Sequence, residues 1–532
     1  MKSNFSVAME DYTTTLNGAI SLTTPDISGE SKGRISLFYK AIRGIQDSKL
    51  YEYLRDASKE NLIDVFLIVF NIRDCRGGKG ERDIGRLCII WLFLNYPNEF
   101  DKVAELLPEY GRWDDLMELW PCVLDLSNLE VVREKFYSNI EDEKTLSQLR
   151  NRQKKIVSIM AKQLVKDRAA MINKEENISL CAKWAPSEHD SYDKKHGVVS
   201  TLCVSLGVSF KKYRKNFITP LRSYIDIVEK KMCEKKWDDI NFNKVPSCAM
   251  KRLKQSFEKN AEKKFSDWKT ELSNRTGKVN AKQLYPHELI KEIRTKKSVD
   301  IVCEAQWEVL EKNVETLGLL QNTLFVCDVS PSMDGVFKSV RPMDVAIALS
   351  LIGANAVKGE FHNHIITFHD SPSFEVIRPG SLYKRYNQII NAPWGISTNL
   401  QATFDLILNK AKKHNLKQED MPTNIIIISD MQFDRATTEN ICEEKTNYQC
   451  VKDKYEASGY KKPHIVFWNV SGMFDDFPTC VTEKGTSLIS GFSPSILQSI
   501  IDGDIENITP YGTLRKTIDI ARLERVRIAL KE

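Results

Sequence analysis

The chain has 532 residues, of which 42% are hydrophobic and 28% are charged. This is the composition of an ordinary globular protein, and the length suits two or three domains rather than one core. Its most apolar stretches are too short to cross a bilayer and its first residues lack the apolar run of a signal peptide, so an intracellular, cytoplasmic protein is expected. The 12 cysteines are scattered without a Cys-x-x-Cys pair, which matches neither a disulfide framework nor a zinc site.

The net charge is only +5, but it is unevenly distributed along the chain. Residues 141–300 hold 36 Lys and Arg against 21 Asp and Glu, so the middle is basic and the ends are acidic. This asymmetry favours a polyanionic partner for the middle segment. A solvated, lysine-rich helix surface explains it equally well until the charges are shown to share one face.

Residues 1–30 are polar and rich in Ser and Thr, and Asn17-Gly18 predicts a turn. We expect part of this segment to be disordered. From residue 31 the apolar residues recur with helical spacing, as over Leu62 to Ile72 and Ile84 to Leu94. Helix follows helix to about residue 318, so residues 31–318 are expected to form an α-solenoid, although they show no clean sequence period.

A glycine-rich basic link, Arg73 to Arg82, joins two of these helices. It lacks the spacing of a Walker phosphate-binding loop, because no Ser or Thr follows Lys79 and no helix opens directly there. A helix-joining turn is therefore favoured over an anion site.

Two basic clusters are candidates for RNA contact. The denser one has an aromatic residue inside it, which suits phosphate contact combined with base stacking. Either cluster could instead only coat a helix, because Lys and Arg stems cover apolar surface well. The candidate RNA-binding residues are Lys211, Lys212, Tyr213, Arg214 and Lys215 in the first cluster and Lys251, Arg252 and Lys254 in the second.

Residues 319–532 alternate strands and helices, which predicts a doubly wound α/β domain. The apolar run Leu324 to Cys327 leads directly into Asp328, and Asn424 to Asp430 is a second run that ends in a carboxylate. Apolar runs without polar alternation are expected of strands covered on both faces. Helices are predicted over Pro342 to Val357 and Asn399 to Lys413, and a further strand over His464 to Val470. The fold class is therefore α plus α/β, in more than one domain.

Hydroxyl and carboxylate side chains follow the ends of these predicted strands. In open α/β sheets ligands bind beyond the carboxyl ends of the strands, and oxygen donors without His or Cys favour Mg²⁺, with Mn²⁺ or Ca²⁺ as alternatives. Each Ser or Thr by itself could only cap a helix, and Thr398 lies where a cap is expected. The candidate metal-binding residues are Asp328, Ser330, Ser332, Thr398 and Asp430.

These five residues resemble the metal-ion-dependent adhesion site, and the chain from about Asn322 resembles a von Willebrand factor A domain. The resemblance implies that Ser330 and Ser332 bind the cation directly, and that Thr398 does so directly or through water. Asp328 and Asp430 would act largely through water. One coordination position would remain for an acidic group of a partner.

Several strings occur in order along the chain, among them Asn71 to Arg82, Gly111 to Leu116, Lys183 to Glu188, Trp394 to Asn399, Ser429 to Phe433 and Val466 to Asn469. On these strings, nearly the whole chain resembles the TROVE and Ro ribonucleoprotein autoantigen architecture, and more closely the TROVE-like proteins of plants, fungi and large DNA viruses. The resemblance implies a HEAT-like helical ring closed by the von Willebrand-type domain. In Ro proteins such a ring binds single-stranded RNA ends in its hole and structured RNA on its basic face.

Three kinds of function remain open from the sequence. The leading one is a non-catalytic, monomeric RNA-binding scaffold, packaged in the virion if the source is a virus. The second is a protein-interaction module in which the metal site captures a partner's Asp or Glu. The third is a Mg²⁺-dependent phosphohydrolase of the haloacid dehalogenase type; it is disfavoured because Ser330 stands where those enzymes have a second acid.

Overall fold

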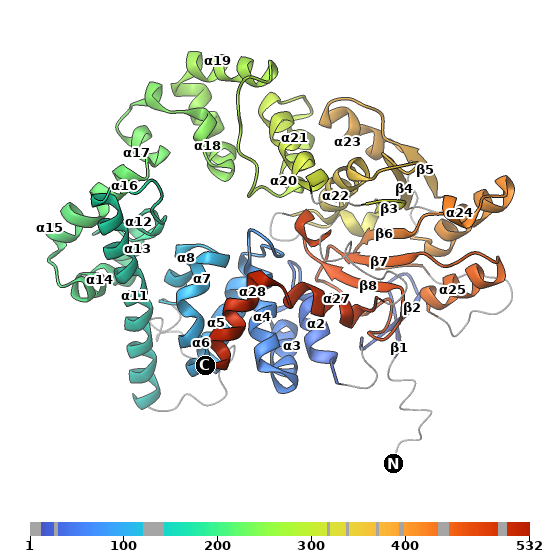
Figure 1. Cartoon of the computed structure of the whole chain (residues 1–532), viewed down its shortest axis with the longest axis horizontal. Helices are drawn as coiled ribbons and strands as arrows, with labels where there is room; N and C mark the ends of the chain where they lie inside the picture. Colours follow the sequence, from blue (N-terminus) through green and yellow to red (C-terminus); the bar gives the residue numbers. More distant parts are fainter. Residues whose placement is uncertain are drawn as a thin grey trace. The chain divides into compact units, whose positions relative to one another are not determined.

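The computed structural model of the chain describes residues 12–25, 30–120, 143–316, 320–336, 340–368, 372–392, 398–434, 446–497 and 508–532 (Figure 1). The chain divides into two compact units. The first, here called the sheet unit, comprises Met1–Ile84, Pro246–Arg252 and Asp267–Leu523. The second, the helical unit, comprises Gly85–Val245, Leu253–Ser266 and Glu524–Glu532. Within the described ranges, no helix has the length and apolarity needed to cross a membrane.

The sheet unit is built on a six-stranded sheet of order β5-β4-β3-β6-β7-β8. Its strands are β3 (Thr323–Asp328), β4 (His364–Phe368), β5 (Ser373–Val376), β6 (Asn424–Ser429), β7 (His464–Asn469) and β8 (Thr486–Ser490). All neighbouring pairs are parallel except β4 and β5. The predicted α/β architecture is confirmed, with the addition of the short antiparallel edge strand β5.

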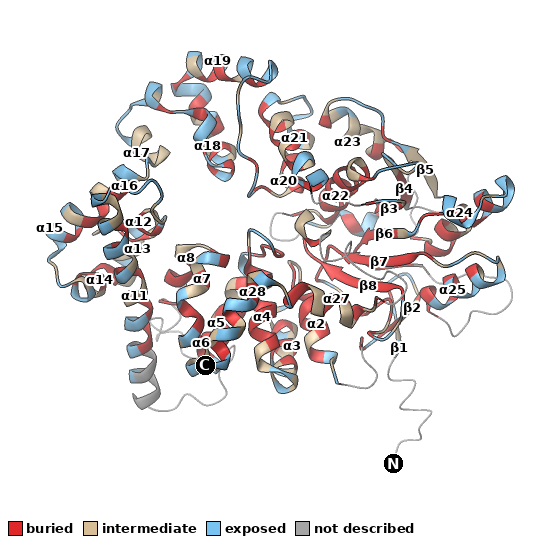
Figure 2. Ribbon diagram, viewed as in Figure 1, coloured by how far each residue is buried: buried red, intermediate tan, exposed pale blue. Residues whose placement is uncertain are grey.

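The central strands are buried on both faces, as their apolar runs predict. Every residue of β3, β7 and β8 is buried (Figure 2). Helix α22 (Pro342–Ala356) covers β3, β4 and β6. It approaches so closely that a Cβ on Gly353 would lie 2.2 Å from the Phe325 ring. Further helices in the described residues of this part are α23 (Leu382–Ile390), α24 (Leu400–His414), α25 (Asn447–Ala457) and α27 (Pro510–Ile518).

Two helices before residue 318 also belong to the core of the sheet unit. They are α20 (Pro286–Lys296) and α21 (Ile301–Thr316), both of which pack on α22. Leu289 and Trp307 lie in the same buried cluster as Phe325 of the sheet. The compact units thus divide the chain differently from the sequence boundary between residues 318 and 319, because helical periodicity shows an apolar face without showing what covers it.

The N-terminal helices belong to the sheet unit as well. They are α2 (Lys32–Lys40), α3 (Asp47–Glu60) and α4 (Leu62–Arg73). Helix α4 is apolar on all sides and almost wholly buried, as expected of a helix enclosed by others. It packs against α27, and Arg515 of α27 forms an ion pair with Asp64 of α4 at 2.6 Å.

The glycine-rich link is a helix-joining turn between α4 and α5 (Asp83–Asn95), as predicted. The Lys79 ammonium is buried and donates to the Phe38 carbonyl and, at 2.7 Å, to the Ser490 hydroxyl. Its hydrogen-bonding groups are directed into the protein, so Lys79 is a packing residue and the alternative of an anion site is not supported.

The polar N-terminal segment contains a hairpin of β1 (Tyr12–Thr14) and β2 (Ile20–Leu22) around the predicted turn at Asn17-Gly18. The structure therefore shows order within residues 12–25. The rest of the segment in which disorder was expected, residues 1–11 and 26–29, lies outside the described residues.

The helical unit is organised on the long helix α11 (Glu143–Ile172), which packs against α8, α12, α14 and α16. A single π-helical turn, η3 (Arg214–Ile218), links α15 (Phe210–Tyr213) to α16 (Thr219–Tyr224). The remaining α-helices of the described residues are α6 (Pro97–Val103), α7 (Leu107–Tyr110), α8 (Trp113–Met117), α12 (Cys181–Trp184), α13 (Ser191–His196), α14 (Val198–Leu206), α17 (Val228–Cys233), α18 (Ser247–Asn260), α19 (Glu262–Ser273) and α28 (Ala521–Lys531).

Candidate metal centre

The candidate metal centre lies where the strand order of the sheet reverses. From β3 the chain crosses to β4 on one side and later returns to β6 on the other. A crevice outside the carboxyl ends of the strands is expected at such a point. Asp328 is the last residue of β3, and Asp430 follows the last residue of β6 directly. Both predicted carboxylates therefore lie at the same edge of the sheet.

Hydrogen bonds connect the two carboxylates through the predicted hydroxyls. The backbone N–H of Ser330 donates to Asp328 Oδ1 at 2.9 Å. The hydroxyl oxygens of Ser330 and Ser332 lie 3.0 Å apart, and Ser332 is hydrogen-bonded to Asp430. On the other side, Ser429 Oγ donates to Asp328 Oδ2 at 2.5 Å. Four of the five predicted ligands thus form one connected group.

Burial disfavours the charged forms of both acids. It raises the pKa of Asp328, although hydrogen bonds from Ser429 and Ser330 partly oppose the shift. Burial, reinforced by the charge of Asp328, raises the pKa of Asp430 to about 7. Two adjacent buried carboxylates carry an electrostatic cost that a divalent cation would remove.

The fifth predicted ligand, Thr398, precedes helix α24. It is fully buried, and its carbonyl accepts from the Asp434 N–H at 3.0 Å. The helix cap is Asn399, whose Oδ1 accepts from the Ala402 N–H at 2.9 Å. The alternative that Thr398 serves as the helix cap is therefore incorrect. Residues 393–397, which hold the rest of the predicted motif, lie outside the described residues.

The site is closed on most sides and open on one. Asp328, Ser330, Thr398 and Asp430 are all buried, whereas Ser332 is exposed. Ser330 begins the short 3-10 helix Pro331–Asp334 without a side-chain capping hydrogen bond, so its hydroxyl is not needed as a cap. The donor set consists only of small oxygens, which fits Mg²⁺, Mn²⁺ or Ca²⁺.

Two supporting residues were not identified from the sequence. Ser429 also accepts from the Met431 N–H at 2.9 Å, and Met431 adopts a left-handed backbone with φ of 68°. A left-handed residue other than glycine carries strain that its surroundings must hold. The Gln432 N–H donates to Asp430 Oδ1 at 3.2 Å. The sequence from Ser429 to Gln432 contributed to the family resemblance, but it did not show these supporting roles, because the hydrogen bonds depend on the geometry of the turn after β6.

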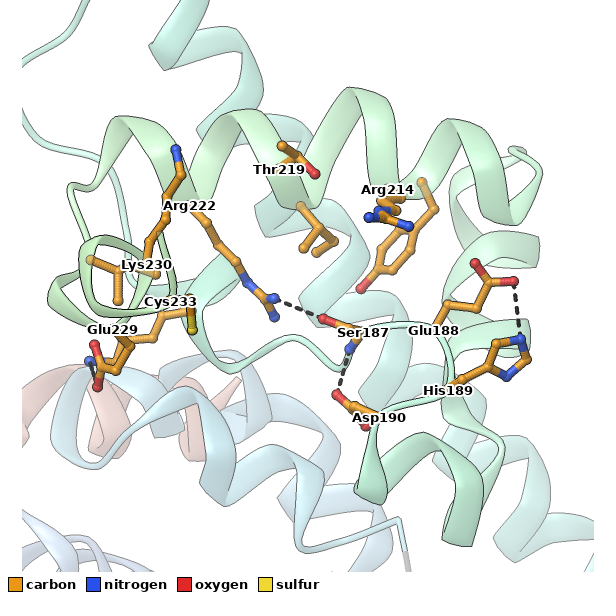
Figure 3. A pocket seen from close by; sticks show the side chains of 14 residues that line it. Ser187, Glu188, His189, Asp190, Arg214, Thr219, Arg222, Glu229, Lys230 and Cys233 are labelled. Carbon is orange, nitrogen blue, oxygen red and sulfur yellow. Dashed lines mark hydrogen bonds and ion pairs between the residues drawn. The ribbon is translucent and has the colours of Figure 1, made fainter. Parts of the chain in front are cut away.

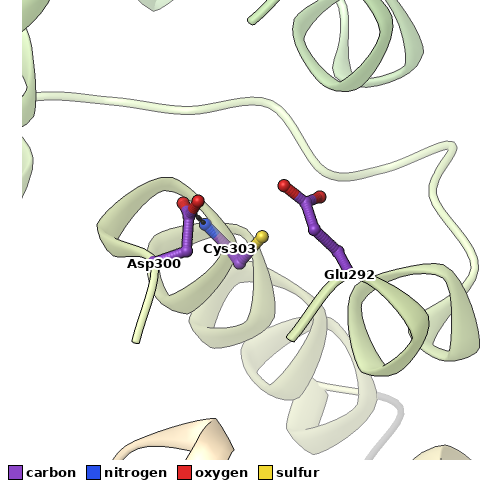
Figure 4. Close-up of side chains that lie close together, drawn as sticks. All are labelled: Glu292, Asp300 and Cys303. Carbon is purple, nitrogen blue, oxygen red and sulfur yellow. Dashed lines mark hydrogen bonds between the residues drawn. The ribbon is translucent and has the colours of Figure 1, made fainter. Parts of the chain in front are cut away.

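A second group of possible ligand atoms, Glu292, Asp300 and Cys303, gathers between α20 and α21 (Figure 4). Lys296 lies among them, with its ammonium 2.8 Å from Glu292 and 2.9 Å from Asp300. Asp300 also accepts from the Val302 and Cys303 N–H groups at the start of α21. These acids are occupied by a lysine and a helix end, which supports a structural role.

The helical unit contains a cavity of about 760 Å³, lined in part by Lys183, Ser187, Arg214 and Arg222 (Figure 3). Its cationic groups are largely satisfied within the protein. The Arg222 guanidinium donates to Ser187 Oγ at 2.8 Å and to the carbonyls of Ala182 and Ala185. Lys183 forms an ion pair with Glu229 at 3.4 Å. Among these lining cations, Arg214 is the one that the described residues leave without a polar partner.

The first basic cluster divides into an exposed and a buried part. Lys211, Lys212, Arg214 and Lys215 are exposed on α15 and η3. They form no ion pair with any described residue. Tyr213 is buried and its hydroxyl donates to the Pro186 carbonyl at 2.8 Å. The expectation that Tyr213 stacks on a base is therefore wrong, because its ring packs inside the helical unit.

The second basic cluster offers fewer free charges. Lys254 is buried, and Lys251 forms an ion pair with Glu288 at 3.2 Å. Arg252 is exposed and has other polar interactions. Lys254 falls on the inner face of α18 with Met250 and Phe257. The prediction that Lys254 contacts phosphate is accordingly not supported.

Comparisons with known proteins give matches over most of the chain. A profile of the domain of unknown function DUF7788 matches residues 322–518, and one of the domain of unknown function DUF2828 matches residues 131–320. An uncharacterized protein of Acanthamoeba polyphaga mimivirus is 29% identical over 502 residues, which cover 90% of this chain and 83% of the viral protein. The crystal structure of the Deinococcus radiodurans RO (RSR) protein matches at 12% identity and a TM-score of 0.37, covering 92% of this chain and 100% of that chain.

Proposed function

We propose that the chain is a non-catalytic binding protein whose sheet unit holds a divalent cation and, through it, an acidic group of a partner. The observation that carries the proposal is the pair of buried carboxylates at the switch point of the sheet. Asp328 and Asp430 lie together with Ser330 and Ser332, and burial raises the pKa of both acids. A Mg²⁺, Mn²⁺ or Ca²⁺ ion would supply the missing positive charge.

We assign this part of the chain to the von Willebrand factor A type. The five predicted ligands would then have the roles that such residues have in a domain of that type. Ser330 and Ser332 would bind the cation directly, Thr398 directly or through water, and Asp328 and Asp430 largely through water. Because Ser332 is the exposed member of the set, we assign the side of Ser332 to the incoming ligand. A carboxylate is the natural ligand for a hard cation that keeps an open position.

The test compares Asp430→Asn with Asp344→Asn in thermal unfolding, with Mg²⁺ or Mn²⁺ and with EDTA. Asp344 is also a buried carboxylate of the sheet unit, but it pairs with Arg294 at 3.0 Å and Arg341 at 3.3 Å. The wild-type Tm should rise with metal, since a ligand at 100 times its Kd adds about 2.7 kcal/mol. Asp430→Asn should lose that rise without a lower Tm in EDTA, because it removes a disfavoured buried charge.

Asp344→Asn should behave in the opposite way. It leaves Arg294 without its acidic partner and Arg341 with Asp334 alone, so its Tm should fall in EDTA, while the metal-dependent rise should persist. A wild-type protein whose Tm is the same with metal and with EDTA would overturn the proposed site.

We also propose that the site does not catalyse phosphoester hydrolysis. Ser330 lies two residues beyond Asp328, where a haloacid dehalogenase-type enzyme needs a second acid. Generic phosphoesters incubated with the metal-loaded protein should show no turnover above buffer. Turnover that disappears in Asp328→Asn would reverse this assignment.

RNA binding by the helical unit is a second candidate function, and one observation favours it. Arg214 and Lys215 lie three and four residues after Lys211, and Lys215 lies three after Lys212, so the four exposed cations lie close together on the surface of α15 and η3. No described acidic side chain pairs with them. We propose that this face contacts the phosphates of single-stranded or structured small RNA. Together with RNA binding we propose that the helices form a HEAT-like ring and that the protein is intracellular and monomeric.

Its test is to purify the protein at low salt and extract any nucleic acid that accompanies it. The variant carries Glu in place of Lys211, Lys212, Arg214 and Lys215. RNase-sensitive material in the wild type that is lost in the variant would support RNA binding. Protein free of RNA in both preparations would leave the cation site as the main function.

A further inference from the structure

The β1–β2 hairpin lies at the same edge of the sheet as the candidate metal centre. The hairpin is the first described segment of the chain, yet β-bridges join Gly18 to Asp434, after β6, and Leu22 to Phe477, after β7. Leu22 and Phe477 exchange two backbone hydrogen bonds of 2.9 Å. The tip is also attached, because Thr15 Oγ1 donates to the Phe433 carbonyl at 2.6 Å. The hairpin therefore lies against the turn that follows β6.

The tip of the hairpin binds the residue that supports Asp430. Gln432 is buried, and its backbone N–H donates to Asp430 Oδ1. Its side-chain Oε1 accepts from the Leu16 N–H at 2.7 Å, and its carbonyl accepts from Asn17 Nδ2 at 2.9 Å. Gln432 is thus held by the hairpin on one side while it holds a predicted metal ligand on the other.

The same amide of Asn17 reaches a second predicted ligand. Asn17 Nδ2 lies 3.4 Å from Thr398 Oγ1. Its orientation is fixed by the shorter bond to Gln432, because a backbone carbonyl can only accept a hydrogen bond and so must face the NH₂ group. The Thr398 hydroxyl oxygen has two lone pairs. A contact from Asn17 to one of them leaves the other for a cation.

We propose that Asn17 is a positioning residue of the cation site, so that the affinity for the cation depends on the docked N-terminal hairpin. The inference rests on the proposed cation site and adds a residue from outside the α/β part of the chain. Asn17 acts on Thr398 directly and on Asp430 through Gln432. Loss of a group that orients metal ligands typically weakens metal binding about 10- to 100-fold.

The coupling must be reciprocal. If the docked hairpin raises the affinity for the cation by some factor, the cation must favour the docked hairpin by the same factor. The N–H groups of Leu16 and Leu22 report on docking, because their acceptors, Gln432 Oε1 and the Phe477 carbonyl, lie outside the hairpin. Their hydrogen exchange should therefore slow when the cation binds.

The experiment measures Mn²⁺ binding to the full chain by isothermal titration calorimetry. In Asn17→Ala the dissociation constant should rise about tenfold. Thr15→Val removes the hairpin's bond to Phe433 while leaving Asn17 in place, so it should weaken Mn²⁺ binding in the same direction. Leu16→Ala is the matched control: its side chain is 74% exposed and its backbone N–H is retained, so its dissociation constant should equal that of the wild type.

Hydrogen exchange of wild type and Asn17→Ala, in EDTA and in Mn²⁺, gives the second readout. Slower exchange at Leu16 and Leu22 with Mn²⁺ in the wild type, and a smaller effect in Asn17→Ala, would support the proposal. Wild-type affinity in Asn17→Ala would overturn the role of Asn17 while leaving the cation site intact. A wild type that binds no Mn²⁺ would instead overturn the site itself.

Discussion

Lys79 and Ser490 are 411 residues apart in the sequence, yet the Lys79 ammonium donates to the Ser490 hydroxyl at 2.7 Å. The lysine comes from the glycine-rich link and the serine from the end of β8. Arg522, at the start of α28, forms an ion pair with Asp74 of the same link. The N-terminal helices and the sheet thus form one folding unit, and the link is one of its internal contacts.

The stability of the sheet unit should therefore be sensitive to the addition of a single methyl group in the glycine-rich link. A Cβ on Gly78 would lie 2.1 Å from the Asn71 carbonyl oxygen, a backbone atom that cannot move aside cheaply. We expect Gly78→Ala to lower the free energy of unfolding of the sheet unit by about 3 kcal/mol. The midpoint of urea unfolding measures this. Gly459→Ala is the control: its φ is +73° with nothing within 4 Å, so it should cost only about 1 kcal/mol.

Acid should destabilise the sheet unit through a buried histidine. His464 lies at the start of β7, with Nε2 2.9 Å from Ser487 Oγ and Nδ1 3.1 Å from Asn424 Oδ1. Burial, together with the charges of Lys462 and Lys516, lowers its pKa to about 3 from an ordinary 6.5. Between these two values the unfolded chain binds a proton that the folded chain does not, so stability falls as the pH falls from 6.5 towards 3.

This single group should contribute a slope approaching about 1.4 kcal/mol per pH unit in that window. Unfolding by urea at several pH values, for wild type and His464→Gln, measures the slope. The variant cannot gain a proton at this position, so its stability should depend less steeply on pH. Identical acid slopes would contradict a neutral His464 in the folded protein.

The proximity of the two candidate carboxylates was predictable because it depends on the topology of the sheet. Two neighbouring parallel strands must end at the same edge of a sheet, so the apolar runs before Asp328 and Asp430 were enough to bring these carboxylates together. Asn17 could not be found in this way. The pair Asn17-Gly18 predicted the turn correctly. The residues that Asn17 contacts, Thr398 and Gln432, lie 381 and 415 residues away in the sequence.

The two basic clusters show that the residue types in a cluster do not by themselves reveal which of its side chains are buried. The four cations around Tyr213 in the sequence favour a role in base stacking. However, Phe217 lies one helical turn further on, and both aromatic side chains are buried. Aromatic residues four apart define an inner helix face. The same spacing places Lys254 on the face of Met250. Helical periodicity therefore could have separated the buried residues from the exposed cations.

Ser332 offers the cleanest test of direct cation binding. It is the exposed member of the candidate set, so its loss should destabilise the metal-free protein by only about 1 kcal/mol, the contribution of its hydrogen bonds to Ser330 and Asp430. We expect Ser332→Ala to weaken Mg²⁺ or Mn²⁺ binding at least about tenfold, an effect measured by calorimetry. Ser205→Ala, an exposed hydroxyl of α14 in the helical unit, should change neither quantity. Equal affinity in Ser332→Ala and wild type would remove Ser332 from the ligand set.

RNA binding, if it uses the exposed cationic face, must depend on salt in a defined way. Each phosphate of a single strand that is neutralised contributes about 0.7 to the slope of log K against log salt concentration. Removing four contacts should therefore reduce that slope by about 3, and affinity should fall without regard to RNA sequence. The variant carries Gln at the four exposed positions of that face, Lys211, Lys212, Arg214 and Lys215.

The matched control removes four positive charges elsewhere in the helical unit. Lys230 and Lys236 pair with Glu234, and Lys231 pairs with Asp226. Because these three cations contact two acids that offset part of their charge, changing them to Gln, together with Lys235, should alter the slope less. Fluorescence anisotropy with a labelled single-stranded RNA at several salt concentrations gives both slopes. Equal slopes in the two variants would show that net charge, and not this face, governs RNA binding.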